Sequence, residues 1–254
     1  MGHAQKRAGR GEWIGAALGP RSPSKGDMEF HLGKSSDASS WKLDWARCTL
    51  DELYETAYLY TRERCSEQIA YFRQLRLEHV TPELFWREYV WGLYTSGFKA
   101  SIVTKIYPRL IEAFGPLGEL AAPEIIVQRV IGVFGNKRKA AAGSVVKCSL
   151  ETFTWTKFRS MYCDSIEKLQ SLPYVGKITK YHLARNLGYD VCKPDLHLCR
   201  LARYFSYEDP ERMCAALSIT NNERIGVVDY VLWNWCSATG TSELELSASA
   251  HVQA

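Results

Sequence analysis

Two short stretches of the sequence combine residue types that could bind a phosphate and activate a water molecule. The first is the apolar turn 172–176, LPYVG, which runs into a basic helix carrying Lys177, Thr179 and Lys180. The first amides of a helix have no partner within the helix, and its dipole favours an anion there. Gly176 would let another backbone approach closely. The motif fits a phosphate site, although an ordinary helix–turn–helix connection has the same residues.

The second stretch is Lys193-Pro194-Asp195, about twenty residues further on. Pro194 disfavours helix at the residue before it, so Asp195 is placed to cap the helix LHLCRLARYF. Capping is a common role for Asp and could be its whole role. A carboxylate fixed at a helix start can also activate water or stabilise a developing positive charge.

Helix-start and helix-stop signals predict the elements that position these two stretches. Period-two alternation hardly occurs, so the expected fold class is all-α. We expect a capping box of Thr49 and Glu52 to open a helix to about Leu75, and Thr81-Pro82-Glu83 to open one that Gly97 ends. Further helices are expected at 101–114, 123–133, 137–148 and 175–187, with others opened by Ser149, Asp164, Asp195, Asp209 and Asn222.

Composition limits the class of protein. The 254 residues carry a net charge of +4, which only weakly favours a nucleic-acid partner. The eight cysteines form no Cys-x-x-Cys pair, and the first residues lack the apolar core of a secretory signal, so we expect reduced thiols in a cytosolic or nuclear protein. No apolar run reaches membrane-spanning length. We expect a disordered basic tail over 1–40, a helical domain over 41–240 with the hairpin at 172–177, and a flexible end over 241–254.

The order of these features resembles one family. LPYVGKITKYHLARNLG followed by VCKPDLHLCRLARYF is similar to the helix–hairpin–helix and Gly/Pro-Asp (HhH-GPD) superfamily of DNA glycosylases, and in particular to endonuclease III-like proteins. FWREYVWGLYTSGFKASIVTKIYPRLIEAFG and APEIIVQRVIGVFGNKRKAAAGSVVKC resemble its earlier helices, so the likeness covers about residues 80–205. It implies two helical lobes with an active cleft between them and the hairpin on one wall.

The resemblance also implies roles for single residues. The hairpin amides of Val175, Gly176 and Lys177, helped by Lys180, would bind a phosphate of the damaged strand. Asp195 would assist attack on C1′ of a nucleotide that has left the base stack.

Other positions are open to two interpretations. Lys193 and the basic turn 136–139, which includes Lys137, could contact phosphate or simply be solvated. Tyr94, Ser96 and Phe98 match the segment that reaches the base pocket in relatives, although aromatic residues are more often core. We expect His197 to support the loop, and Trp233 and Trp235 to lie in the core.

Two positions depart from the family pattern. Bifunctional relatives carry a lysine where this chain has Ile178, which cannot form a Schiff base. Tyr174 stands where the family usually has Gly, and could change the hairpin or stack on a nucleotide. The resemblance therefore implies a monofunctional glycosylase with water as nucleophile, while a displaced lysine nucleophile stays a minor alternative.

No cofactor and no metal are expected. Cys199, Cys214 and Cys236 are too widely spaced for the iron–sulfur cluster of some relatives. Cys192, Cys199 and His197 make a poor zinc site without a second pair of ligands.

We expect an intracellular monomer, in the cytoplasm or nucleoid or in a nucleus, that acts on double-stranded DNA and has no membrane association. Two alternatives remain: an enzyme of thymine hypermodification in viral DNA, which keeps the base, and a non-catalytic DNA-binding protein that uses the hairpin alone.

Overall fold

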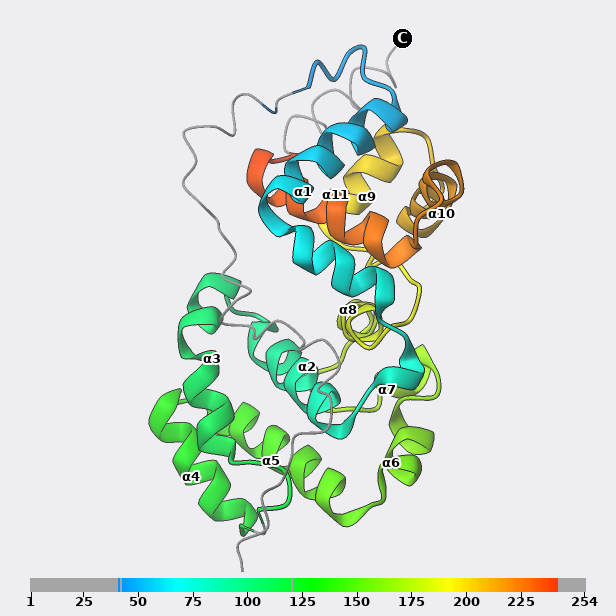
Figure 1. Ribbon diagram of the computed structural model, residues 1–254. Helices are drawn as coiled ribbons and strands as arrows, with labels where there is room; N and C mark the ends of the chain where they lie inside the picture. The colour runs from blue at the N-terminus through cyan, green and yellow to red at the C-terminus, as the bar shows by residue number, and fades with distance from the viewer. Residues whose placement is uncertain (1–40, 42, 120, 242–254) are drawn as a thin grey trace, which may run out of the picture.

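The computed structural model describes residues 41, 43–119 and 121–241, and every regular element in this part is a helix. The helices form two lobes, one above the other in Figure 1, with α8 (Thr179–Asn186) at the junction. The all-α, two-lobed fold expected from the sequence is confirmed. The tail expected over 1–40 and nearly all of the C-terminal end, 242–254, lie outside the described residues.

The lower lobe holds one hydrophobic core, which residues from Val80 to Leu187 form. Four of its largest buried side chains, those of Trp86, Tyr89, Trp91 and Tyr94, come from α2, which is apolar on most sides, as the sequence indicates. The elements of this lobe, in chain order, are α2 (Pro82–Thr95), α3 (Ala100–Phe114), α4 (Pro123–Val133), α5 (Lys137–Thr152), α6 (Trp155–Tyr162), α7 (Ile166–Leu169) and α8.

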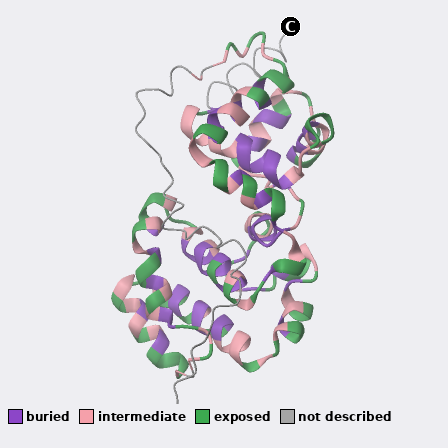
Figure 2. Ribbon diagram, in the orientation of Figure 1, coloured by how far each residue is buried: buried purple, intermediate pink, exposed green. Residues whose placement is uncertain are grey.

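The upper lobe joins the first described helix to the last three. Its separate core combines side chains of α1 (Leu50–Gln74) with those of α9 (Leu196–Tyr204), α10 (Pro210–Asn221) and α11 (Ile225–Thr239). Trp235 on α11 is 1 % exposed in this core, as expected, whereas Trp233 is only partly buried. Figure 2 shows the buried residues along the inner faces of the helices in both lobes.

Local capping signals identified several helix starts correctly. The Thr49–Glu52 capping box is present, with the Thr49 amide donating to Glu52 Oε2 at 2.8 Å. Thr81 caps α2 ahead of Pro82, and Asp209 accepts from the Arg212 amide at 2.8 Å. Each side-chain oxygen satisfies an amide that the helix itself leaves unpaired.

Other boundaries were wrong. Helix α5 continues through Ser149 to Thr152, and Thr154 caps α6 instead. Ser165, not Asp164, caps α7 by accepting from the Lys168 amide. Asn222 does not open the last helix: its φ of 48° ends α10 in the left-handed conformation, which Asn tolerates well.

The backbone at Gly188 closely approaches the backbone of Arg76 and Leu77, where the two lobes meet. Its φ is +91°, and a Cβ there would lie 2.5 Å from the carbonyl carbon of Arg76 in the segment after α1. Arg224, the N-cap residue of α11, donates to the carbonyl of Gly188 at 2.9 Å and to that of Phe72 on α1 at 2.7 Å. One guanidinium thus ties the end of α8 to the end of α1.

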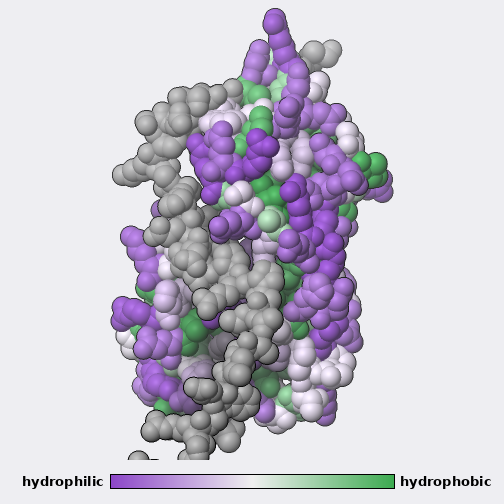
Figure 3. Space-filling model, viewed as in Figure 1, coloured by the Kyte–Doolittle hydropathy of each residue, from purple (hydrophilic) through white to green (hydrophobic). Residues whose placement is uncertain are grey.

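Hydrophilic residues cover most of the coloured part of the face drawn in Figure 3, with hydrophobic residues in small patches between them. Within the described ranges, no helix combines the length and apolar character needed to cross a membrane.

Candidate functional site

The hairpin is a loop of nine residues, 170–178, between α7 and α8. Tyr174 lies in it with φ +63°, a region that a residue with a Cβ adopts at a cost of about 1–2 kcal/mol. The Tyr89 hydroxyl donates to the Pro173 carbonyl at 3.1 Å, and the Val175 amide donates to the Leu172 carbonyl at 3.1 Å. These bonds hold the turn on the core of the lower lobe.

Helix α8 begins at Thr179, four residues later than the expected start at Val175. The Gly176 amide donates to Thr179 Oγ1 at 2.7 Å, so this hydroxyl closes the turn before the helix. Of the three amides expected to bind phosphate, those of Val175 and Gly176 therefore already have acceptors, Leu172 in the hairpin and Thr179 at the start of α8. The described residues offer the Lys177 amide no acceptor, and its side chain is exposed.

The other expected phosphate contacts are differently placed. Lys180 Nζ lies 3.1 Å from Glu167 Oε1, and only 12 % of its side chain is exposed. Lys137 is exposed at the first position of α5, a helix that Asn136 caps by accepting from the Lys139 amide. Lys177, Lys137 and Arg138 face solvent without an ion pair among the described residues.

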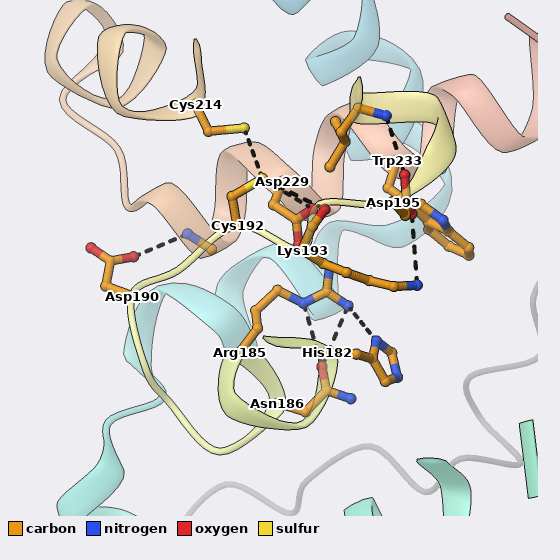
Figure 4. A network of polar contacts seen from close by, with 12 residues as sticks. His182, Arg185, Asn186, Asp190, Cys192, Lys193, Asp195, Cys214, Asp229 and Trp233 are labelled. Carbon is orange, nitrogen blue, oxygen red and sulfur yellow. Dashed lines mark hydrogen bonds and ion pairs between the residues drawn. The ribbon is translucent and has the colours of Figure 1, made fainter. Parts of the chain in front are cut away.

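Asp195 caps α9, as expected from the sequence. Its Oδ1 accepts from the Leu198 amide at 3.1 Å, and its Oδ2 lies 3.7 Å from Lys193 Nζ. The side chain is 12 % exposed. One carboxylate oxygen is thus fixed by the helix, and the other faces an ammonium with access to solvent. In Figure 4 a dashed line joins the Lys193 ammonium to the Asp195 carboxylate.

Arg185, Asp229, Asn186 and Glu88 form a buried polar network at the junction of the lobes. Arg185 on α8 forms an ion pair with Asp229 on α11, and the two side chains are 7 % and 1 % exposed. Burial raises the pKa of Asp229, and Arg185 opposes that rise. Asn186 extends the network by donating to Glu88 Oε2 on α2 at 2.6 Å. The network therefore connects α2, α8 and α11 across the junction of the lobes. Figure 4 shows its central part, Arg185, Asn186 and Asp229.

The loop that carries Asp195 is tied to the same network. Cys192 Sγ lies 3.9 Å from Asp229 Oδ1 and 3.5 Å from Cys214 Sγ on α10. The contact with Cys214 and burial raise the pKa of the Cys192 thiol. All eight cysteines are free thiols. Within the described residues, no three His, Cys, Asp or Glu side chains are grouped as for a metal ion.

Lys139 organises the expected base-pocket residues. Its Nζ donates to the carbonyls of Leu93 at 2.6 Å and Ser96 at 2.5 Å, at the C-terminal end of α2. It also lies 4.7 Å from the centre of the Phe98 ring and 5.5 Å from that of Tyr174. Lys139 is 3 % exposed, and burial lowers its pKa to about 8. Both sequence interpretations of this lysine, solvated face and phosphate contact, are therefore wrong.

The three expected pocket residues have different environments. Tyr94 is fully buried, and its hydroxyl has no hydrogen-bond partner among the described residues. Ser96 is partly buried, and Phe98 is 38 % exposed. Tyr174, at 40 % exposure, presents a second ring near the same lysine. The structure therefore places the hairpin next to the turn that follows α2.

His197 Nδ1 is 2.8 Å from Thr241 Oγ1, and burial lowers the pKa of the imidazole. This contact supports the loop-supporting role expected for it. The network residues Glu88, Arg185 and Asp229 were missed. A charged residue inside an apolar run, as in VVDYVLW, was the signal that could have identified Asp229.

No family model matches the chain, and no curated protein matches its sequence. One solved structure is similar: the Methanocaldococcus jannaschii 8-oxoguanine glycosylase/lyase in complex with a 15-mer DNA containing 8-oxoguanine. The TM-score is 0.54 at 17 % sequence identity, and the match covers 76 % of this chain and 98 % of that one. The likeness shows that the two chains share a helical fold.

Proposed function

We propose that this chain is a DNA N-glycosylase, which extrudes a damaged or modified base and hydrolyses its N-glycosidic bond. The observation that carries the proposal is the position of Asp195. Its carboxylate is fixed by the α9 amide of Leu198, stands next to an ammonium and follows a hairpin with an open amide. A glycosylase/lyase crystallised with DNA has the same fold, which supports DNA as the substrate.

Asp195 would act on the sugar. Departure of the base leaves positive charge on C1′ and the ring oxygen, which a nearby carboxylate stabilises. The same carboxylate can accept a proton from the attacking water. Oδ2 is the atom for both tasks, because Oδ1 accepts the Leu198 amide.

We propose water as the nucleophile for base release. Ile178, at the position of the lysine in bifunctional relatives, has an alkyl side chain that is 45 % exposed. An alkyl group offers no lone pair to C1′, so the hairpin itself supplies no covalent intermediate. We therefore propose that base release is a hydrolysis, as in a monofunctional glycosylase.

DNA binding would use the lower lobe and the loop before α9. The Lys177 amide and ammonium face solvent at the hairpin, and Lys137 does so at the start of α5. Phe98 and Tyr174 would stack on the extruded base, because both rings are partly exposed beside Lys139. We expect the protein to act as a monomer where DNA is present, in a cytoplasm, nucleoid or nucleus.

A panel of duplexes, each with one lesion or modified base, tests this function. Products are separated with and without hot alkali, which breaks the strand at an abasic site. Breaks that need alkali, and that Asp195→Asn abolishes, are the expected result on at least one duplex.

A second candidate is base modification without removal, for which the Tyr174 and Ile178 departures leave room. Mass spectrometry of the recovered nucleosides separates the two. A base that stays on the strand and gains mass supports modification, whereas a free base supports the glycosylase. DNA binding without either product would leave only the hairpin's binding role.

A further inference from the structure

Lys193 is the primary amine that the structure places beside the Asp195 carboxylate. Its Nζ is 3.7 Å from Asp195 Oδ2, and 23 % of its side chain is exposed (Figure 4). A lysine amine next to a carboxylate, with access to solvent, can reach a carbonyl carbon that the carboxylate also contacts.

The backbone fixes this arrangement. The Asp195 amide donates to the Lys193 carbonyl at 2.7 Å, which closes a three-residue turn around Pro194. Proline holds φ near −65°, close to the value that such a turn needs. The thiol of Cys192 lies 3.7 Å from the same carbonyl and is anchored against Asp229. Lys193 and Asp195 are therefore presented together by one rigid loop.

Other lysines near the site are less suited to attack a sugar. Lys139 is buried and donates to the carbonyls of Leu93 and Ser96. Lys180 is paired with Glu167 and not with Asp195, and its side chain is less exposed than that of Lys193, 12 % against 23 %. Lys177 is exposed on the hairpin and is the main competitor.

We propose that Lys193 gives the protein a second activity, cleavage of the DNA strand at an abasic site through a Schiff base between Lys193 Nζ and C1′. The inference rests on the proposed glycosylase function, because hydrolysis of the N-glycosidic bond is what generates the abasic site. Bifunctional relatives carry the reactive lysine in the hairpin, at the position of Ile178. In this protein the amine would come from Lys193, in the loop before α9.

The chemistry needs no further reactant. Asp195 accepts a proton from the Lys193 ammonium, and the amine so formed adds to the aldehyde carbon C1′ of the ring-opened sugar. The proton then passes to the C1′ hydroxyl, which leaves as water and gives the iminium. A carboxylate, for which Asp195 is placed, takes a proton from C2′. The C3′–O bond then breaks, and the 3′-phosphate leaves with the electron pair. Water finally hydrolyses the unsaturated imine and releases the amine.

Reductive trapping tests the proposal directly. The full-length protein is incubated with a duplex that carries a pre-formed abasic site, so that base release is not needed. Sodium borohydride supplies hydride to the iminium carbon and converts it into a stable secondary amine. Trypsin then yields the peptide 186–200, NLGYDVCKPDLHLCR, which contains a single lysine, Lys193.

The expected result is a protein–DNA adduct on peptide 186–200. Lys193→Arg, which keeps the positive charge without a nucleophilic amine, loses it. Lys105→Arg on α3, an exposed position outside the site, keeps it. An adduct on Lys177 or another lysine, or no adduct at all, overturns the inference.

The panel of lesion duplexes distinguishes failure of the Lys193 proposal from failure of the proposed glycosylase function. Alkali-dependent breaks without an adduct leave the glycosylase standing and remove the role of Lys193. An adduct on Lys193 without base release from any duplex supports the Lys193 activity and removes the glycosylase.

Discussion

Arg185 and Asp229 form a buried ion pair that joins α8, the helix after the hairpin, to α11 in the other lobe. The loop with Lys193 and Asp195 leaves α8 and enters α9 beside this pair (Figure 4). The pair therefore fixes the position of α8 relative to the candidate catalytic carboxylate of Asp195.

Removing one partner of this pair leaves a buried charge without compensation. We expect Asp229→Ala to lower the free energy of unfolding by about 3–5 kcal/mol. Glu208→Ala provides the control, because it breaks the Arg212–Glu208 pair, whose side chains are 69 % and 70 % exposed. That control is expected to cost at most about 1 kcal/mol. Urea unfolding of both variants measures the difference. Equal losses in the free energy of unfolding would mean that the buried pair stabilises the fold no more than the exposed pair does.

The close approach at Gly188 has a matched control in the same chain. Gly188 and Gly118 both have φ +91°, but of these two only Gly188 has neighbours within 4 Å of the point that a Cβ would occupy. Gly118→Ala should cost only backbone strain, about 1–3 kcal/mol. Gly188→Ala adds overpacking against Arg76 and Leu77, about 1–3 kcal/mol more. Thermal unfolding distinguishes them, and a similar loss in both would refute a tight joint between the lobes.

Lys139 predicts a pH dependence of stability. Burial lowers its pKa to about 8 in the folded protein, against about 10.4 in an unfolded chain. Between these values the unfolded state binds more protons, so Lys139 adds stability as pH rises from about 8 toward 10.4. Burial also raises the pKa of the neighbouring Tyr94, which therefore stays neutral over this window.

The measurement is the stability of the wild type relative to Lys139→Met at pH 7, 8, 9 and 10. The difference should be constant below about pH 8 and then move in favour of the wild type. A difference that does not change with pH would show that Lys139 is not desolvated in solution.

The exposed side chain of Lys177 in the hairpin predicts that DNA binding depends on salt concentration. If Lys177 contacts a phosphate, Lys177→Gln should lower the slope of log affinity against log salt concentration by about 0.9. Lys105→Gln on α3 removes an equivalent exposed charge and should leave the slope unchanged. Fluorescence anisotropy with a duplex that carries an abasic-site analogue measures both slopes. Equal slopes for Lys177→Gln and the wild type would place the phosphate elsewhere.

Local signals explain how far the sequence could predict the fold. The Thr49–Glu52 box, Thr81-Pro82 and Asp195 each cap a helix through atoms within three residues, so their patterns are readable along the chain. The start of α8 was misplaced because Val175 is apolar and buried like a helix residue. The turn is in fact prolonged by the φ of Tyr174 and the Thr179 hydroxyl.

The parts of the site that depend on distant contacts were not predictable. Residues 137–139 are three consecutive basic residues, and only the carbonyls of α2 decide that Lys139 is buried while Lys137 stays exposed. Arg185 and Asp229 are 44 positions apart in sequence. The contact between Lys193 and Asp195 is local, but it depends on the turn around Pro194, which the sequence indicates only as a break in helix.

The role of Asp195 is the central claim, and the most direct test is the rate of base release under single-turnover conditions, for the wild type and Asp195→Asn, on whichever duplex the panel identifies. Asn also caps helices well, so the variant should unfold like the wild type and differ only in its lack of a carboxylate. We predict base release slower by about 10²- to 10⁴-fold. Release at the wild-type rate by a folded Asp195→Asn protein would contradict the account.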